Sequence, residues 1–554
     1  MSELIRRRVA AVVMAVLCTL AAVGVIAPSY ADSYTPITGE GSSWASNAIL
    51  DWAAAVHSSG IQVNWAPNAS VTALTNYANG NSDNFVASDV PYGLPGGQTP
   101  GVPGRGYGYV PDVAGGTALM YNLSVGGQRF TNLKLSGQAI AGIFQGAIKL
   151  WNDPQIQASN PGVALPPLQI TPVIRADQSG STYQFSLYLE KTFPGQWHCG
   201  AFTDPSKCGP WASLKGQSGD SGVAGYVAQS GNVGSIGYVQ YSYALQSGYP
   251  VAKVLNSAGY YVLPTASNVA VALLGAKVNL NASDHNNYLT QDLSGVYTSG
   301  DQRSYPISSY SYFVLPTATT NGVSTTTGHT IAAFANYALC SGQKDMPTLG
   351  YSPLPINLAQ AGLDQVKKVP GAGTASININ SCNNPTFSTN GTNTLALNAL
   401  YPDLCDKQGA KAGCGYGKSS HGKSSSSSGQ GDNNAVGNHT SGSSSSGGGS
   451  TVVGAGGGST TTGVPGSTTP GGSSSTGAGG GGGNSSLSLT NPNGQYTCDP
   501  DTGQCTKLAA TPTLVANHAG STFSEWAIWV ALASLIALVA VPPISVLLKR
   551  RAAR

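Results

Sequence analysis

Apolar and polar residues between about positions 33 and 385 follow two alternating periods. One stretch has apolar residues at the three- and four-residue spacing of a helix, namely Ala45, Ala48, Ile49, Trp52 and Val56. Residues 61–65 then alternate as in a strand, residues 85–87 predict another short strand, and a longer helix is predicted over 136–151. This repetition of strand, polar turn and helix predicts an α/β fold. About 350 residues are too many for one simple core, which favours two lobes.

Both ends of the chain carry long apolar runs beside basic residues. Residues 1–31 hold three arginines, a charge-free run and a small-residue ending, which predicts a cleaved secretory signal peptide. A retained N-terminal membrane helix is the alternative. Residues 526–548 are uncharged for 23 positions, enough to form a transmembrane helix across a bilayer core about 30 Å thick. The basic residues in 549–554 predict a cytoplasmic tail, so we expect a single-pass cell-membrane protein whose main domain is extracellular.

The composition changes several times between the domain and the C-terminal apolar run. Residues 386–414 form an extension that contains two cysteines. Residues 415–486 are mostly Gly, Ser and Thr, which cannot bury enough apolar surface to fold, so they predict a disordered, flexible linker. Residues 487–520 contain two further cysteines and predict a small cysteine-paired segment before the membrane.

The charge balance excludes one class of partner. The chain carries +3 overall, of which residues 1–31 contribute +2 and residues 549–554 contribute +4, leaving −3 for the exported part. A mildly acidic exported domain lacks the basic surface of a nucleic-acid binder. Any anion that it binds must be held by local donors.

The cysteines indicate an oxidising compartment. Eight remain once Cys18 leaves with the signal, and an even number outside the cell predicts disulfides. The spacing suggests local bridges 199/208, 405/414 and 498/505, which leaves 340 to pair with 382. Spacing alone does not choose among the possible connectivities. Because no Cys-x-x-Cys motif occurs and the histidines are scattered, neither a metal nor a cofactor is expected.

Three predicted strand-to-helix junctions are rich in hydroxyl residues. They are Gly39-Glu-Gly-Ser-Ser-Trp44, Pro67-Asn-Ala-Ser70 and Arg175-Ala-Asp-Gln-Ser-Gly-Ser181. The first N–H groups of a helix lack intrahelical partners and the helix dipole is positive there, so each junction can bind an oxyanion. Taken singly, each junction is better explained as an ordinary helix cap, but three together, one with an arginine, indicate a shared anion site.

The third junction has the most specific chemistry. Arg175 can offer a fork of donors to a tetrahedral oxyanion, and Asp177 could hold that fork by ion pairing. Asp89, in Val86-Ala-Ser-Asp-Val-Pro91, is unexpected in an anion site. A carboxylate repels a fully ionised anion but accepts a hydrogen bond from one that keeps a proton, so it would favour hydrogen phosphate over sulfate.

These segments resemble the phosphate-binding proteins of bacterial high-affinity phosphate ABC importers. Over about residues 35–370, in the family's order, further similar segments are Leu135–Phe144, Leu150–Asp153, Asn160–Gly162, Gly237–Tyr241 and Tyr305–Tyr310. The resemblance implies a type II periplasmic-binding-protein fold, with two hinged lobes that close around inorganic phosphate and then deliver it to an ABC permease. It implies a phosphate-binding domain at 33–385, with lobe 1 at about 33–110 and 276–385 and lobe 2 at about 111–275.

The resemblance also implies the ligand groups. The positions that match the family's phosphate contacts are Ser43, Trp44, Ser70, Asp89, Arg175, Ser179, Gly180 and Ser181. Trp44 would contribute its backbone N–H, Asp177 resembles the partner of the arginine, and Asp220 would help to hold the Arg175 region. Glu40 departs from the family by adding a carboxylate near the site. The tether and membrane helix are also atypical of the family.

Three other functions are compatible with parts of the sequence. Gly219-Asp-Ser-Gly222 also surrounds the nucleophile of trypsin-like proteases, but no histidine lies in a triad context, so we expect no enzyme. A surface-displayed adhesin or structural protein on the same fold would explain the long linker. A third possibility is another oxyanion as ligand, although Asp89 argues against sulfate.

Overall fold

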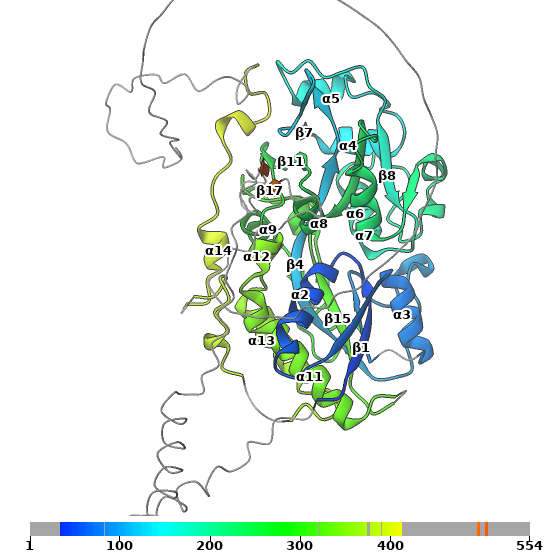
Figure 1. Cartoon of the computed structure of the whole chain (residues 1–554), viewed down its shortest axis with the longest axis vertical. Helices are drawn as coiled ribbons and strands as arrows, with labels where there is room; N and C mark the ends of the chain where they lie inside the picture. Colours follow the sequence, from blue (N-terminus) through cyan, green and yellow to red (C-terminus); the bar gives the residue numbers. More distant parts are fainter. Residues whose placement is uncertain are drawn as a thin grey trace, which may run out of the picture. The chain divides into compact units, whose positions relative to one another are not determined.

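The computed structural model describes residues 34–81, 84–320, 322–373, 377–388 and 390–412, together with two short strands at 496–498 and 505–507 (Figure 1). The predicted signal peptide, the linker and the C-terminal apolar run lie outside the described residues. Within the described residues, no helix is long and apolar enough to cross a membrane.

A nine-stranded mixed sheet organises the domain. Its strands run in the order β2-β1-β3-β15-β4-β10-β8-β9, and β16 also pairs with β4. Their bounds are β1 Ile37–Ser42, β2 Val63–Asn68, β3 Phe85–Ser88, β4 Tyr107–Tyr121, β8 Thr171–Arg175, β9 Lys215–Gln217, β10 Ser235–Gln240, β15 Ser308–Pro316 and β16 Tyr351–Ser352. Smaller sheets of two or three strands are formed by β5 Ser124–Val125, β6 Gln128–Arg129, β7 Lys134–Leu135, β11 Lys253–Leu255, β12 Tyr261–Val262, β13 Lys277–Val278, β14 Gln291–Asp292, β17 Tyr496–Cys498 and β18 Cys505–Lys507.

Helices cover both halves of this sheet. They are α2 Ser46–His57, α3 Ser70–Asn79, α4 Gly137–Phe144, α5 Pro154–Ser159, α6 Gly180–Thr192, α7 Gly219–Val227, α8 Tyr241–Ser247, α9 Ala266–Leu273, α10 Ser294–Tyr297, α11 Thr325–Leu339, α12 Met346–Leu349, α13 Ile356–Val366 and α14 Thr394–Leu397. In Figure 1, α2, α3 and β1 belong to one lobe and α4, α6, α7 and β8 to the other, with β4 running between them. The expected α/β fold with two lobes is therefore confirmed.

The long strand β4 connects the two halves through its pairing partners. Residues 107–116 pair antiparallel with β15, which continues to β3 and β1, whereas residues 117–121 pair antiparallel with β10. β10 in turn pairs in parallel with β8. The strands β1, β3, β8 and β10 end at Ser42, Ser88, Arg175 and Gln240. Because ligands of α/β sheets bind beyond the carboxyl ends of the strands, these four ends mark the place to look for a site.

Local sequence explains the first elements well and one helix only in part. α2 buries Ala48, Ile49, Trp52 and Val56, so the helical spacing of these residues correctly predicts the face that packs on the sheet. The helix expected over 136–151 is wrong in its second half, because α4 ends at Phe144. Gly146 follows in the left-handed conformation, with φ of 75°, which ends a helix at little cost for glycine.

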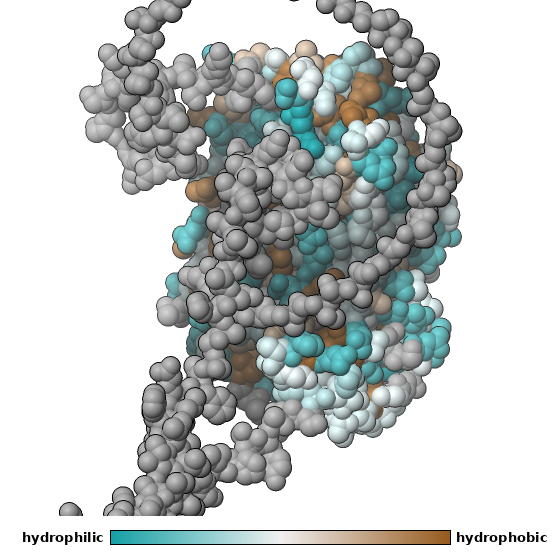
Figure 2. Space-filling model, in the orientation of Figure 1, coloured by the Kyte–Doolittle hydropathy of each residue, from teal (hydrophilic) through white to brown (hydrophobic). Residues whose placement is uncertain are grey.

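Buried side chains form a main core that includes Trp52, Phe85 and Phe313, and a second cluster lies around β10, α7 and α8. Figure 2 shows that polar residues occupy much of the visible described surface, with smaller apolar patches between them. This distribution is the usual one for a domain that folds in water.

The C-terminal extension (residues 386–414) packs on the domain where it is described. Asp406, 6% exposed, forms ion pairs with Lys134 (3.0 Å) and Lys253 (2.7 Å). Farther back along the chain, the hydroxyl of Thr386 donates to the carbonyl of Leu354 at 2.7 Å. Charge pairing and hydrogen bonding therefore attach the extension to the domain.

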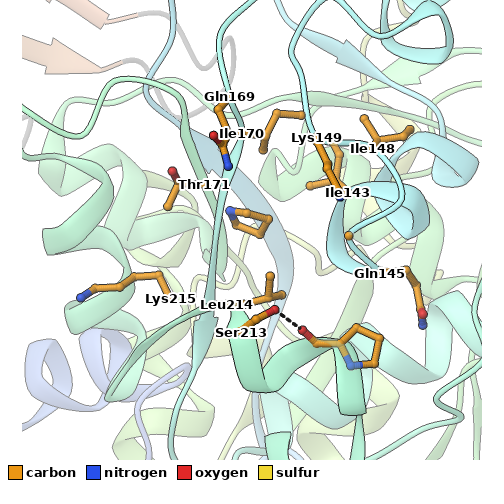
Figure 3. Close-up of a pocket in the computed structure, with 13 residues that line it drawn as sticks. Ile143, Gln145, Ile148, Lys149, Gln169, Ile170, Thr171, Ser213, Leu214 and Lys215 are labelled. Atoms are coloured by element: carbon orange, nitrogen blue, oxygen red, sulfur yellow. Dashed lines mark hydrogen bonds between the residues drawn. The ribbon is translucent and has the colours of Figure 1, made fainter.

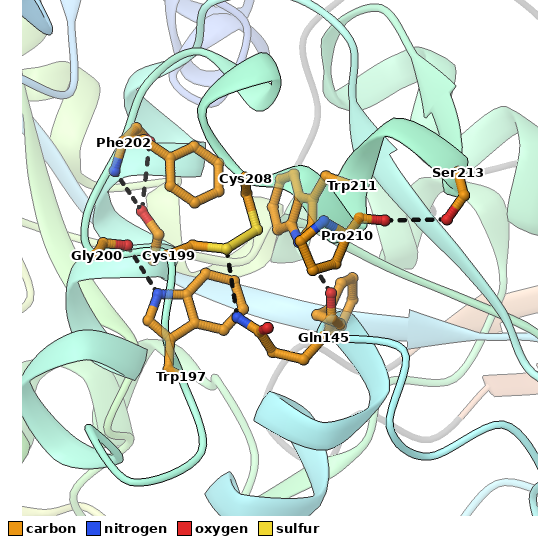
Figure 4. Close-up of a disulfide and its surroundings, with 11 residues drawn as sticks. Gln145, Trp197, Cys199, Gly200, Phe202, Cys208, Pro210, Trp211 and Ser213 are labelled. Atoms are coloured by element: carbon orange, nitrogen blue, oxygen red, sulfur yellow. Dashed lines mark hydrogen bonds between the residues drawn. A yellow bond between two sulfur atoms is a disulfide. The ribbon is translucent and has the colours of Figure 1, made fainter.

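Two of the four disulfides suggested by cysteine spacing are confirmed, Cys199–Cys208 and Cys340–Cys382. Figure 4 shows the first, which closes a loop beside Trp197 and Trp211. Cys405 is also disulfide-bonded, while position 414 lies outside the described residues. Cys498 and Cys505 are register partners in the β17–β18 pair.

Candidate functional site

The first junction brings two serines to the carboxyl end of β1. Ser42 and Ser43 are 1% and 3% exposed, and the Ser42 hydroxyl accepts a hydrogen bond from the backbone N–H of Ala45 at 3.2 Å. The Ser43 hydroxyl donates to Asp220 Oδ2 at 2.6 Å and lies 3.0 Å from the Asp220 backbone nitrogen. Ser43 comes from the lobe of β1 and Asp220 from helix α7 of the other lobe, so this contact joins the lobes.

Asp89 follows β3 and is surrounded by hydroxyl groups. Its carboxylate accepts hydrogen bonds from Ser42 at 2.6 Å, Ser70 at 3.3 Å and Ser181 at 3.4 Å. Burial raises the pKa of Asp89 to about 6, and the nearby charge of Asp220 acts in the same direction, while the Ser42 hydrogen bond opposes it. This carboxyl group therefore takes up a proton more readily than an exposed aspartate does.

Arg175, at the end of β8, is held between two carboxylates. Its Nε donates to Asp177 Oδ1 at 2.8 Å and its Nη2 pairs with the other oxygen of Asp177, while Nη1 donates to Asp220 Oδ2 at 2.6 Å. Burial lowers the pKa of Arg175, but Asp220 and then Asp177 outweigh that effect and raise it overall. Burial alone would raise the pKa of Asp177, but the hydrogen bonds and charge of Arg175 keep this pKa below the ordinary value. The guanidinium is thus permanently charged and fixed in direction.

The N-terminus of α6 supplies the remaining predicted groups. Ser179 is the N-cap, and its hydroxyl accepts hydrogen bonds from the backbone N–H groups of Ser181 and Thr182. A Cβ on Gly180 would lie 2.8 Å from Asp89 Cβ and 2.9 Å from Ser70 Oγ, so only glycine lets the helix approach the other lobe this closely.

The structure therefore places seven of the eight predicted ligand residues together: Ser43, Ser70, Asp89, Arg175, Ser179, Gly180 and Ser181. The side chains among them are 1–3% exposed. Donors and acceptors from both lobes thus enclose one buried polar centre.

The side chains of Trp44 and Glu40 make their contacts outside this polar centre. The indole Nε1 of Trp44 donates to Thr117 at 3.2 Å and its ring packs in the core, so its side chain belongs to the lobe interior. Glu40 accepts hydrogen bonds from Asn68 at 2.9 Å and Asn76 at 2.7 Å. The additional carboxylate of Glu40 therefore joins β1 to the end of β2 and to α3.

Two residues of this polar centre, Ser42 and Tyr238, were not predicted as site residues from the sequence. Ser42 lies in the first junction but is not among the ligand groups that the resemblance implies, yet it makes the shortest hydrogen bond to the Asp89 carboxylate. Tyr238 donates or accepts at the Thr182 hydroxyl (2.7 Å) and accepts from the Arg175 backbone N–H at 3.1 Å. Tyr238 lies in the Gly237–Tyr241 segment, whose resemblance to the family was the sequence signal that could have indicated it. Only the pairing of β10 with β8 shows that this segment lies beside Arg175.

A separate pocket of about 570 Å³ lies at the other end of β8 (Figure 3). Thr171 and Pro172, at the start of that strand, help to line it, as do Lys149 and Lys215. Since Arg175 is at the end of the same strand, this pocket is distinct from the buried centre.

Comparison with known proteins agrees with this architecture. The profile of the PBP superfamily domain matches residues 27–341. A phosphate-binding protein, PstS2, of Mycobacterium bovis is 32% identical over 300 residues, covering 53% of this chain and 76% of the relative. The chain belongs to the phosphate-binding protein family of the PBP superfamily.

Two further proteins are similar to parts of this chain. The phosphate-binding protein PstS of Xylella fastidiosa (strain Temecula1) is 30% identical over 325 residues, covering 58% of this chain and 83% of the relative. A solved phosphate-binding protein of Stenotrophomonas maltophilia has 18% identity and a TM-score of 0.43, covering 60% of this chain and 93% of that one.

Proposed function

We propose that this protein captures inorganic phosphate between its two lobes and delivers it to an ABC permease. The observation that carries the proposal is the buried Arg175 guanidinium, which faces a cluster of hydroxyls and Asp89 drawn from both lobes. The proposed ligand groups are Ser43, the Trp44 backbone N–H, Ser70, Asp89, Arg175, Ser179, Gly180 and Ser181. Asp177 and Asp220 hold the arginine in place.

The charges of the site favour an oxyanion that carries a proton. One guanidinium is accompanied by the carboxylates of Asp177, Asp220 and Asp89, so the site offers no excess of positive charge. A fully ionised sulfate would face the Asp89 carboxylate with no proton to donate. Hydrogen phosphate can donate to Asp89 and accept from Arg175 and the hydroxyls, which is the complementary pattern.

Binding rather than chemistry is the proposed activity. Ligand contacts from both lobes stabilise the closed form, and a permease can recognise that form. The Asp220 carboxylate, within the protease-like tetrapeptide, already accepts from Arg175, Ser43 and the Gln240 backbone N–H. The adhesin alternative has no such support, because display on a surface does not require a buried arginine surrounded by serine hydroxyls.

The proposed location follows from the sequence. We infer that the signal peptide exports the chain and that residues 526–548 anchor it in the cell membrane. The domain then lies outside the cell on the linker of residues 415–486, and residues 549–554 lie in the cytoplasm.

Titration calorimetry of the full-length protein, stripped of ligand, tests the proposal. We expect one-to-one binding of phosphate and no heat with sulfate. Arg175→Ala should weaken phosphate binding by about 100-fold or more, because a charge-assisted donor is lost and buried carboxylates are left without it. Arg303→Ala is the matched control, since Arg303 forms a similar two-bond pair with Asp301, also two residues away. If calorimetry detects no binding of phosphate to the wild-type protein, the proposed function is refuted.

A further inference from the structure

The two lobes also meet through a pair of residues outside the phosphate site. Thr203 donates its backbone N–H to Gln98 Oε1 at 2.9 Å, and its hydroxyl donates to the Gln98 carbonyl at 2.7 Å. The hydroxyl also lies 3.2 Å from Gln98 Oε1. Gln98 is partly exposed, whereas Thr203 is buried. These contacts join positions 105 residues apart in the chain.

Each partner is firmly attached to its own lobe. Gln98 directly follows the short 3₁₀ turn η1 (Pro95–Gly97), in a loop closed by a hydrogen bond from the Leu94 N–H to the Thr99 hydroxyl at 2.9 Å. The same loop is fixed to α3 by the Tyr92 hydroxyl, which donates to the Leu74 carbonyl at 3.0 Å. Movement of Gln98 therefore follows movement of the β1 lobe.

Thr203 lies in the loop closed by the Cys199–Cys208 disulfide (Figure 4). Its neighbour Phe202 is 1% exposed and packs edge-on against Trp211, with ring centroids 4.9 Å apart. The Phe202 backbone N–H donates to the Ser186 hydroxyl on α6 at 3.0 Å. The loop thus moves with α6 and the second lobe.

One hydrogen bond connects this contact to the phosphate site. The Ser179 backbone N–H donates to the Thr203 carbonyl at 3.1 Å, so Thr203 touches the residue that caps α6. Separation of the lobes would break the Gln98–Thr203 bonds and the ligand contacts together. These bonds can therefore hold the closed form without touching the ligand.

We propose that Gln98 and Thr203 form a latch that prolongs the closed, phosphate-bound state. They are positioning residues, and this role rests on the proposed function for the identity of the ligand. Because the latch forms only as the lobes meet, its loss accelerates release and leaves capture unchanged.

Release of radiolabelled phosphate from full-length protein tests the latch. We expect Gln98→Ala and Thr203→Val to raise the dissociation rate about five- to tenfold, as loss of one or two neutral hydrogen bonds predicts. The association rate should stay at the wild-type value, which a folding defect would not allow. Thr203→Ser keeps both donors and should restore slow release.

Gln145→Ala is the matched control. Gln145 contacts the same loop from within its own lobe, with Nε2 3.4 Å from Cys199 Sγ (Figure 4). The proposed latch would be overturned if Gln98→Ala released phosphate at the wild-type rate. It would also be overturned if Gln145→Ala accelerated release as much as Gln98→Ala does.

Hydrogen–deuterium exchange gives a second readout that does not depend on the ligand. The Thr203 amide, which donates to Gln98, should exchange at least about fivefold faster in Gln98→Ala and at the wild-type rate in Gln145→Ala. If wild-type protein does not bind phosphate, the proposed function fails and this measurement still decides the latch. Unchanged exchange in Gln98→Ala would then overturn it.

Discussion

Replacing Asp89 with asparagine is expected to stabilise the ligand-free protein near neutral pH. The carboxyl group is 2% exposed, and burial raises its pKa from 3.8 to about 6. At about 1.4 kcal/mol per pKa unit, this difference corresponds to a penalty of about 3 kcal/mol when the group is ionised. Asparagine has the same shape and can still exchange hydrogen bonds with the surrounding hydroxyls, but it carries no charge to bury.

The pH dependence of this effect has a definite sign. Between about pH 4 and pH 6 the native protein holds a proton on Asp89 that the unfolded chain has released, so stability falls as the pH rises. Above pH 6 the penalty is complete, and below pH 4 it is absent. The variant should therefore match the wild type at pH 4 and exceed it by about 3 kcal/mol at pH 7.5.

Thermal unfolding followed by tryptophan fluorescence measures the difference. For a domain of this size, about 3 kcal/mol corresponds to a rise of about 4 °C in melting temperature. Asp364→Asn, at an exposed aspartate on α13, is the control for the substitution itself. The reasoning is refuted if Asp89→Asn melts at or below the wild-type temperature at pH 7.5, or if the difference is the same at pH 4 and pH 7.5.

Three further predictions concern the close helix approach at Gly180, the ion pairs of Asp406 and the disulfide between Cys340 and Cys382. Gly180→Ala should weaken phosphate binding by about 1–3 kcal/mol, because its Cβ would lie 2.8 Å from Asp89 Cβ in the closed site; calorimetry showing unchanged affinity would contradict this. Asp406→Asn should lower stability by about 3 kcal/mol, because it removes the carboxylate between two lysines, and denaturant unfolding at pH 7 would detect the loss. Replacing both Cys340 and Cys382 by serine should cost about 4 kcal/mol, as expected for opening a loop of 42 residues; an unchanged denaturation midpoint would exclude a stabilising role.

The sequence predicted the local parts of the site because their signals are local. Hydroxyl residues at a helix start and an arginine two positions before an aspartate each have a physical reason within a few residues. Helical spacing likewise predicts the buried face of α2. The helix expected over 136–151 was too long because the left-handed residue Gly146 outweighed the continuing apolar pattern.

Only the tertiary structure decided which of these local groups meet. The pairing of β4 with both β15 and β10 aligns the strand ends of the two lobes, and this brings Ser43 to Asp220, 177 residues away. It also makes Ser42 a partner of Asp89 and directs Glu40 to two asparagines. The periodicity of a chain specifies which face of an element is buried, whereas contacts between distant elements depend on strand order and register. The chemistry of the site was therefore predictable from its residues, and its geometry was not.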